Sequence, residues 1–330
     1  MMNFQNLPDE LVLKIFNYSE INHLLTCGQV SKRIRRISRD DTLWVTANLE
    51  KKIVKTELLE MILQKGCRIL NICHSTILGC LKSNIKSQLK VFKFRSSSRP
   101  CEEIHILEEL LSSCCSLQHL VMEHVPVTSK MAASICKNGK TLQTLNLKGS
   151  YLDVPPSWGA SYHINYFQGI IRYCQELKEV DLGDEAYERD FSGDFYFLVK
   201  NIPPNVEKLR YLSGGMFMDH HFKILLSRCN KIKALSLEHT VMTDELLTNI
   251  RQCLNLTLEE LSCKQRRPLN ASFRGFLELK FMPRLNILNL YYNSCYEEYD
   301  EEEIQNLRQH LPHLMIKCFD RRKSLQENTT

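Results

Sequence analysis

The stretch IKALSLEHTVMTDELLTNI, residues 232–250, combines two hydrophobic patterns. In its first part Leu235 and Leu237 alternate with other residues, which is the period of a half-buried strand. In its second part apolar residues recur at helical spacing. Thr243 or Asp244, just before them, can cap the N-terminus of this helix. The apolar stripe of this helix is Leu246, Leu247 and Ile250. The stretch therefore predicts a short strand, a turn and an amphipathic helix.

The strand pattern, L-x-x-L-x-L with apolar substitutions, recurs along most of the chain. Its fourth position falls on Leu70, Phe92, Leu120, Leu145, Val180, Leu209, Leu235, Leu261, Leu288 and Leu314. The copies follow one another about every 26 residues, within the 20 to 29 residues of a leucine-rich repeat. The cysteines before the strands are typical of its cysteine-containing class: Cys115, Cys136, Cys174, Cys229 and Cys253. We therefore expect an α/β leucine-rich-repeat solenoid, a horseshoe of about ten stacked repeats, over residues 49–319.

Residues 1–48 do not fit the repeat and predict three short helices instead. Pro8 suits the first position of the first helix, with Asp9 and Glu10 in its first turn. The apolar residues of the three helices are Leu11, Val12, Ile15 and Phe16, then Leu24, Leu25 and Val30, then Ile34, Ile37, Leu43 and Trp44. A domain this small with so much apolar surface usually shares its core with a partner.

The same residues resemble an F-box. The matching segments, in order, are LPDELVLKIFNY (7–18), Leu24-Leu25, VSKRIRRI (30–37) and Leu43-Trp44. Ile34 stands where the family usually has an aromatic residue, and Gly28 falls inside the expected second helix. The resemblance implies binding to the Skp adaptor of SCF ubiquitin ligases and, through it, to the cullin and RING subunits. The residues implied for the Skp contact are Leu7, Pro8, Leu11, Ile15, Phe16, Leu24, Leu25, Val30, Leu43 and Trp44.

An F-box followed by leucine-rich repeats resembles the substrate receptors of those ligases. The resemblance implies an F-box at 1–48, a substrate-binding solenoid at 49–319 and a tail at 320–330. It also implies a protein that is not an enzyme, because ubiquitination would follow from proximity of the substrate to the conjugating enzyme. A Skp-binding scaffold or decoy that delivers no substrate needs the same F-box and repeats, so this alternative stays open.

The motifs of catalysis and cofactor binding are absent from the sequence. Gly139-Lys140-Thr141 resembles the end of a phosphate loop, but Ser134 stands where the loop needs glycine. His119 and His124 lie near Cys114 and Cys115, but the chain has no C-x-x-C pair and no zinc-site spacing. Serine-hydrolase, zinc-protease and dinucleotide motifs are missing too. We therefore predict no catalytic residue, metal or cofactor.

Charge is distributed in blocks along the sequence. The 43 Lys and Arg residues outnumber 38 Asp and Glu by too little to suggest a nucleic-acid binder. Residues 61–101 contain eight Lys or Arg and no acid, residues 176–194 contain eight acids and two bases, and residues 297–303 are acidic again. Two interpretations remain: an unevenly charged, solvated surface, or a polarised groove that steers a bipolar protein partner.

The x positions of L-x-x-L-x-L point away from the core, so they are candidates for substrate contact. They include Lys93, Arg95, His119, Glu123, Asn146, Lys148, Glu179, Asp181, Lys208, Arg210, Glu238, Glu260 and Tyr291. The long step between Leu145 and Val180 adds a loop, residues 151–162, in which Trp158 is a candidate aromatic anchor. The plainer alternatives are that the polar residues only face water and that Trp158 covers its own repeat.

The N-terminal residues lack the basic and apolar regions of a secretory signal, and no segment has the roughly 18 apolar residues of a spanning helix. We therefore expect a soluble protein of the cytoplasm or nucleus, without a membrane partner. Its 14 cysteines are scattered through apolar segments, which favours reduced, buried thiols.

Overall fold

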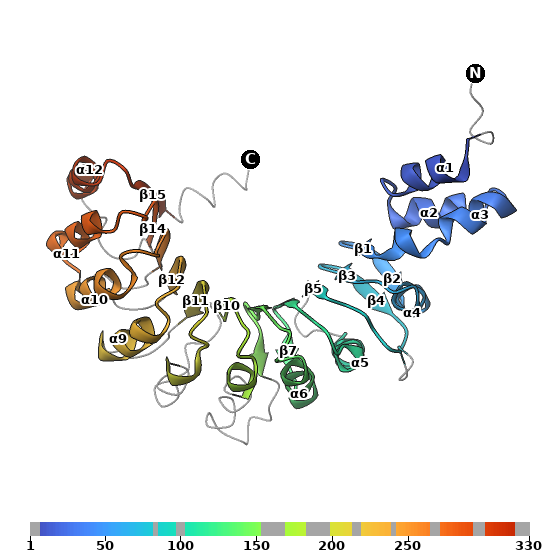
Figure 1. The fold of residues 1–330 in the computed structure, drawn as a ribbon, viewed down its shortest axis with the longest axis horizontal. Coiled ribbons are helices and arrows are strands. Elements are labelled where there is room, and N and C mark those ends of the chain that lie inside the picture. The colour runs from blue at the N-terminus through green and yellow to red at the C-terminus, as the bar shows by residue number, and fades with distance from the viewer. Residues whose placement is uncertain are drawn as a thin grey trace. The chain divides into compact units, whose positions relative to one another are not determined.

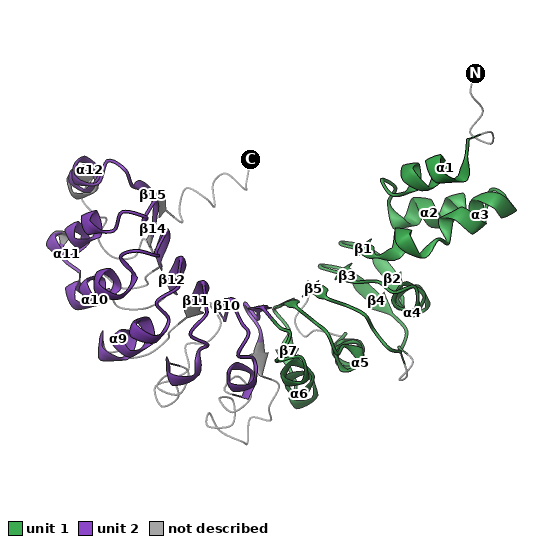
Figure 2. Ribbon diagram, viewed as in Figure 1, with its two compact units in different colours: residues 1–142 green, residues 143–330 purple. Residues whose placement is uncertain are grey.

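The computed structural model divides into two compact units, Met1–Leu142 and Gln143–Thr330 (Figure 2). It describes residues 7–81, 85–96, 103–152, 169–182, 199–212, 219–238, 242–264, 271–292 and 301–320.

Unit 1 begins with the predicted short helices. They are α1 (Asp9–Phe16), α2 (Ile21–Cys27) and α3 (Lys32–Ser38), followed by the 3-10 turn η2 (Asp41–Trp44). The carbonyl of Pro8 accepts the amides of Leu11 and Val12, each at 3.1 Å, so α1 starts one residue later than predicted. Ser31 caps α3, because its Oγ accepts the amide of Ile34 at 3.1 Å.

These helices enclose a small core of their own. Phe16, Leu24, Ile34 and Trp44 are all buried, and the Trp44 indole donates to the Ser38 carbonyl at 3.1 Å. Gly28 follows α2 and does not lie inside it, contrary to the prediction. A Cβ at Gly28 would lie 2.9 Å from Ser38 Oγ, so glycine permits the close approach of α2 and α3.

The repeats of unit 1 follow without a break. The elements are β1 (Thr46–Asn48), β2 (Ile53–Lys55), α4 (Thr56–Gln64), β3 (Ile69–Asn71), β4 (Thr76–Leu78), β5 (Val91–Arg95), α5 (Ile104–Ser113), β6 (His119–Glu123), β7 (Pro126–Val127) and α6 (Ser129–Lys137). Strands β1, β3, β5 and β6 are neighbours in that order, all parallel, and β2 pairs with β4.

The first repeat strand was not predicted. Ala47 of β1 is in register with Leu70 of β3, which makes Ala47 the fourth position of an earlier repeat. The turn after the strand supports this, because Lys51, His74 and His124 occupy equivalent places and all have positive φ, between 56° and 59°. The prediction that no repeat begins before residue 49 was therefore wrong.

Unit 2 continues the same plan. Its elements are β8 (Thr144–Asn146), β9 (Tyr151–Leu152), β10 (Glu179–Asp181), β11 (Lys208–Leu212), α9 (Asp219–Arg228), β12 (Ala234–Glu238), α10 (Asp244–Leu254), β13 (Glu260–Lys264), α11 (Phe273–Leu277), η4 (Glu278–Phe281), β14 (Ile287–Tyr292), α12 (Glu301–His310) and β15 (Met315–Asp320). Strands β8 and β10 to β15 pair in parallel in chain order. Helices α9 to α12 lie on one side of these strands (Figure 1).

The predicted α/β leucine-rich-repeat fold is confirmed, with one error of register. Thr243 caps α10 by accepting the Leu246 amide at 3.0 Å, and the predicted stripe of this helix is buried. In the last repeat, however, Leu288 pairs with Ile316, so Ile316 holds the fourth position that the sequence pattern gave to Leu314.

The cysteines mark the start of several repeats. Cys114, Cys174 and Cys229 occupy the same place before their strands and are buried, whereas the predicted Cys115 is exposed. Burial raises the pKa of the Cys67, Cys114 and Cys229 thiols to about 11. The cysteines that the structure describes are free thiols.

Two kinds of feature are absent from the described part of the chain. It has no helix with the length and apolar character needed to cross a bilayer. It also has no group of three or more His, Cys, Asp or Glu side chains placed to hold a metal ion.

Candidate protein-interaction surfaces

The helical region exposes large apolar side chains although its own core is complete. Leu11 and Ile15 lie one turn apart on α1 and are 44% and 45% exposed. Leu25 on α2 is partly exposed, Val30 just before α3 is 73% exposed, and Tyr18 after α1 is 93% exposed. Exposed apolar side chains in this number are typical of a protein-binding surface.

The ten residues predicted for the Skp contact fall into two sets. Pro8, Leu11, Ile15, Leu25 and Val30 are exposed, and Leu7 is half-buried. Phe16, Leu24, Leu43 and Trp44 are buried in the chain's own core. The expectation that Phe16 and Trp44 become buried by a partner is therefore corrected: the fold already buries them.

Tyr18 was missed by the sequence reasoning. Tyr18 lies three residues after Ile15, a spacing that places neighbouring side chains on the same side of a helix. This spacing could have identified Tyr18 from the sequence.

Asp9 holds α1 against α3. Its carboxylate accepts Arg33 Nε at 2.8 Å and also pairs with Arg36. The hydrogen bond from Arg33 is the largest cause that holds the pKa of Asp9 below its usual value. Desolvation opposes it, and the hydrogen bond from Arg36 lowers the pKa further. Arg33 also donates to the Leu7 carbonyl, which fixes the residue that precedes α1.

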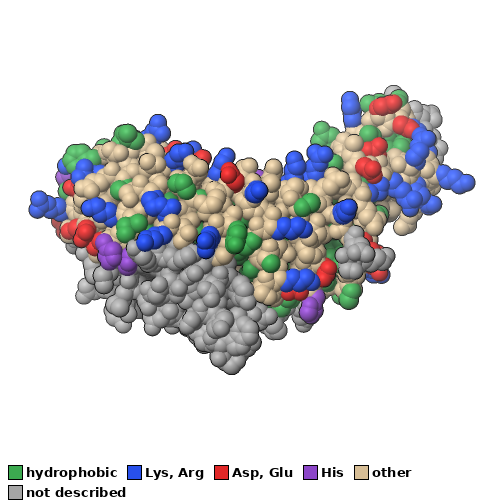
Figure 3. Space-filling view, turned by 60° about the horizontal axis from the view of Figure 1, so that its bottom comes forward, with side chains coloured by type: hydrophobic (Ala, Val, Ile, Leu, Met, Phe, Trp, Pro, Cys, Tyr) green, Lys and Arg blue, Asp and Glu red, His purple; other side chains and the backbone are tan. Residues whose placement is uncertain are grey.

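Helix α3 is strongly basic, a feature that the sequence analysis did not single out. Its cations and the one after it are Lys32, Arg33, Arg35, Arg36 and Arg39. Arg35 Nε donates to the Gly28 carbonyl at 2.8 Å, so one of these cations joins α3 to the end of α2. Figure 3 shows Lys and Arg side chains gathered over the helical end of unit 1.

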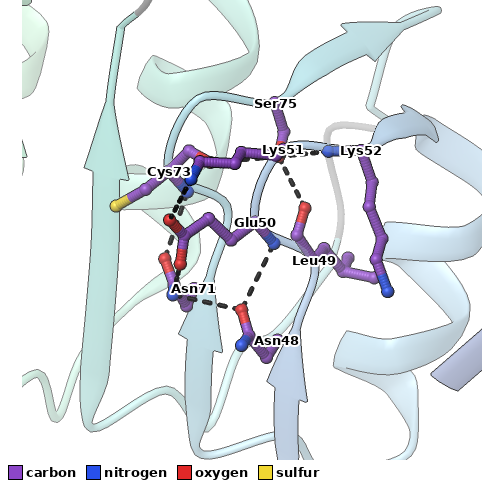
Figure 4. A network of polar contacts seen from close by, with 8 residues as sticks. All are labelled: Asn48, Leu49, Glu50, Lys51, Lys52, Asn71, Cys73 and Ser75. Atoms are coloured by element: carbon purple, nitrogen blue, oxygen red, sulfur yellow. Dashed lines mark hydrogen bonds and ion pairs between the residues drawn. The ribbon is translucent and has the colours of Figure 1, made fainter. Parts of the chain in front are cut away.

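The exposed strand face of unit 1 carries polar side chains in rows. Asn48, Asn71, Lys93 and Val121 are in register across β1, β3, β5 and β6. Asn71 Nδ2 donates to Asn48 Oδ1 at 3.1 Å and to Glu50 Oε2 at 3.4 Å (Figure 4). Asn71 Oδ1 accepts the amide of Cys73 at 3.1 Å, so the asparagines order both the face and the turn beyond it.

The predicted substrate residues of this face include two cations in different situations. Arg95 is paired with Glu123, with 3.5 Å between Nε and Oε2. Lys93 is exposed. His119, at the start of β6, is half-buried. Burial raises the pKa of the Cys73 thiol, and the charges of Glu50 and Glu123 raise it further. Lys93 and Arg95 oppose this shift, so all four charged residues lie near the thiol.

On the strand face of unit 2, predicted contact residues pair with one another. Glu179 of β10 bonds Lys208 of β11 at 2.8 Å, and Asp181 lies 3.9 Å from Arg210 on the same two strands. Glu260 accepts Asn289 Nδ2 at 2.7 Å. The acidic and basic residues of β10 and β11 therefore largely neutralise each other.

The remaining candidates are turn residues or lie outside the described structure. Asn146 Oδ1 accepts the Lys148 amide at 2.9 Å and so stabilises the turn after β8. Trp158 and most of its loop, 153–162, lie outside the described residues, as do the side chains of Glu238 and Tyr291.

Two comparisons with known proteins bear on these surfaces. Residues 4–50 match the model of the F-box-like family, and F-box domains generally bind Skp adaptors. Among solved structures, the leucine-rich repeat-containing protein LegL7 from Legionella pneumophila is similar, with 12% identity and a TM-score of 0.44. That match covers 82% of this chain and 80% of LegL7. The exposed helical region therefore lies in the part of the chain that matches the F-box-like family, a protein-interaction module.

Proposed function

We propose that this chain is the substrate-recognition subunit of an SCF-type cullin-RING ubiquitin ligase. In this proposal the F-box-like helices bind the Skp adaptor, and the repeats capture a protein substrate. The observation that carries it is the exposure of Leu11, Ile15, Leu25 and Val30 on a region that matches the F-box-like family and has a complete core.

The exposed aliphatic side chains give the adaptor contact its driving force. Burial of a large aliphatic side chain contributes about 1.5 to 3 kcal/mol when it is removed fully from water. Leu11 and Ile15 are about half exposed, so each has roughly half of that available. The Asp9–Arg33 contact positions α1 before any partner arrives, which lowers the entropy lost on binding.

The repeats would act by holding a substrate beside the conjugating enzyme. Their strands are fixed by parallel pairing and carry polar side chains on the exposed face. A substrate bound there would experience a raised effective concentration of the activated ubiquitin, which accelerates transfer without a catalytic residue in this chain.

The adaptor contact is tested with two matched double variants of the full chain. Leu11→Asp/Ile15→Asp places charge on the exposed face of α1. Ile53→Asp/Leu78→Asp makes the same change at exposed aliphatic positions of β2 and β4. The first variant should lose co-purification of Skp and cullin, and the second should retain it, both with an unchanged melting temperature. Equal Skp binding by the first variant and the native chain would contradict the proposal.

Substrate delivery is tested by affinity purification with and without an inhibitor of cullin activation. Proteins that a ligase delivers for degradation should co-purify more strongly after inhibition. If Skp binds but no co-purifying protein changes, the chain is a Skp-binding scaffold or decoy.

A further inference from the structure

The described residues of two of the three charge blocks differ in how they pair. On the strand face of unit 2, Glu179 and Asp181 lie against Lys208 and Arg210. In unit 1, by contrast, Arg68, Lys90 and Lys93 are exposed and none forms an ion pair among the described residues. Three cations that form no ion pair with a described residue therefore remain on β5 and on the residues that lead into β3 and β5.

These three cations belong to neighbouring strands. The amide of Lys90 donates to the carbonyl of Arg68 at 2.8 Å, so the two residues stand side by side where β5 and β3 begin. Lys93 lies further along β5, in register with Asn71 on one side and Val121 on the other. Lys93 thus lies on the strand face, and Arg68 and Lys90 stand beside each other at the end where β3 and β5 begin.

Along the strands, two aliphatic residues lie between the Arg68–Lys90 pair and the position of Lys93. Ile69 of β3 is 38% exposed and is in register with Val91 of β5, which is half-buried. A ligand that fits this section needs anionic groups for the cations and an apolar group for Ile69 and Val91.

A polypeptide meets these requirements better than a nucleic acid does. Single-stranded nucleic acids bind through aromatic side chains on which bases stack. The phenyl rings of β5, Phe92 and Phe94, are buried, β3 has no aromatic residue, and the imidazole of His119 in β6 is half-buried. Strands about 4.8 Å apart give the four-strand face a width of about 14 Å, which four or five extended residues would cross.

We propose that the exposed face of β3 and β5 binds an acidic peptide segment of a partner protein. Its Asp or Glu carboxylates contact Arg68, Lys90 and Lys93, and an aliphatic side chain between them packs on Ile69 and Val91. The identification of this partner as a ubiquitination substrate rests on the proposed function, whereas the peptide contact itself does not require Skp.

The test is fluorescence anisotropy of the full chain with a labelled twelve-residue peptide, four repeats of Asp-Glu-Leu. The comparison probes are the Asn-Gln-Leu peptide and a twelve-nucleotide single strand of DNA. Lys90→Glu/Lys93→Glu reverses the charge of the site. Lys137→Glu/Lys140→Glu makes the same change at exposed positions at and after the end of α6.

The acidic peptide should bind the native chain at least tenfold more tightly than the amide peptide or the DNA. It should bind Lys90→Glu/Lys93→Glu at least tenfold more weakly, bind the control variant unchanged, and weaken as salt rises. Absence of binding to the native chain, equal loss in both variants, or tighter binding of the DNA would overturn the inference. Skp binding is measured separately, so failure here leaves the proposed function standing.

Discussion

Asp244 and Gly275 fit against each other so closely that the Asp244 carboxylate leaves no room for a side chain at Gly275. A Cβ at Gly275 would lie 2.2 Å from Asp244 Oδ1. The same carboxylate accepts the amide and the hydroxyl of Ser272, the cap of α11, at 2.7 and 2.8 Å. Asp219 and Thr243 make the equivalent contact one repeat earlier, at 2.7 Å. Successive helices of unit 2 are therefore joined at their N-terminal ends.

Gly275→Ala should destabilise unit 2, by about 1 to 3 kcal/mol, because the methyl group displaces the Asp244 carboxylate. Chemical denaturation of the single and double variants measures this. In an Asp244→Ala background the Gly275→Ala change should be smaller, since the clashing oxygen is gone. Strictly additive effects would show that the two residues do not interact.

Trp44→Ala should destabilise the F-box-like region by about 3 to 5 kcal/mol, because its ring is buried and its indole is hydrogen-bonded within the chain. Ile15→Asp should leave stability nearly unchanged and weaken Skp binding instead. Unfolding followed by circular dichroism distinguishes the two. A stable Trp44→Ala chain that fails to bind Skp would place the ring in the interface, against the structure.

Asp9 should make the helical region sensitive to acid. Arg33 and Arg36 lower the pKa of Asp9 in the folded chain. The contribution of ionised Asp9 to the stability of the fold is therefore complete above its unfolded pKa of about 3.9. It is lost as the pH falls through the lower pKa of Asp9 in the folded chain. Asp9→Asn should remove this part of the pH dependence. An NMR titration that finds an ordinary pKa for Asp9 would contradict the pairing.

Thiol alkylation should separate the cysteines by repeat position. The pKa of Cys263 is raised to about 12 by burial, and those of Cys67, Cys114 and Cys229 to about 11. At pH 8 less than about 1% of each is thiolate, so these four should react only on unfolding. Exposed Cys80 and Cys115 should react first with iodoacetamide, as read by mass spectrometry. Early labelling of Cys263 would indicate a loosened repeat.

The repeats were predictable because alternation forces residues such as Leu235 and Leu237 into one buried face. The first and last repeats were not, since their patterns are ambiguous. Ala47 is too small to stand out as a core residue, and both Leu314 and Ile316 fit the buried position of the last strand. Strand pairing with the neighbouring repeat decides between such alternatives, and sequence periodicity does not contain that information.

The candidate sites were predicted only in part for a related reason. The F-box resemblance identified the apolar residues but could not separate the exposed Leu11 and Ile15 from the buried Phe16 and Trp44, because all four satisfy the same helical and apolar pattern. Likewise, x positions in the repeats predicted that Glu179 and Lys208 are accessible but not that they pair across adjacent strands. Both distinctions depend on contacts between elements.

The most direct test of the central proposal is hydrogen–deuterium exchange of the native full chain with and without saturating Skp. Amides of α1, α2 and the segment through Val30 should exchange more slowly in the complex, while those of β10 to β15 should not change. Unchanged exchange throughout residues 8–30, with protection confined to the repeats, would contradict the assignment of the exposed F-box-like helices as the adaptor-binding surface.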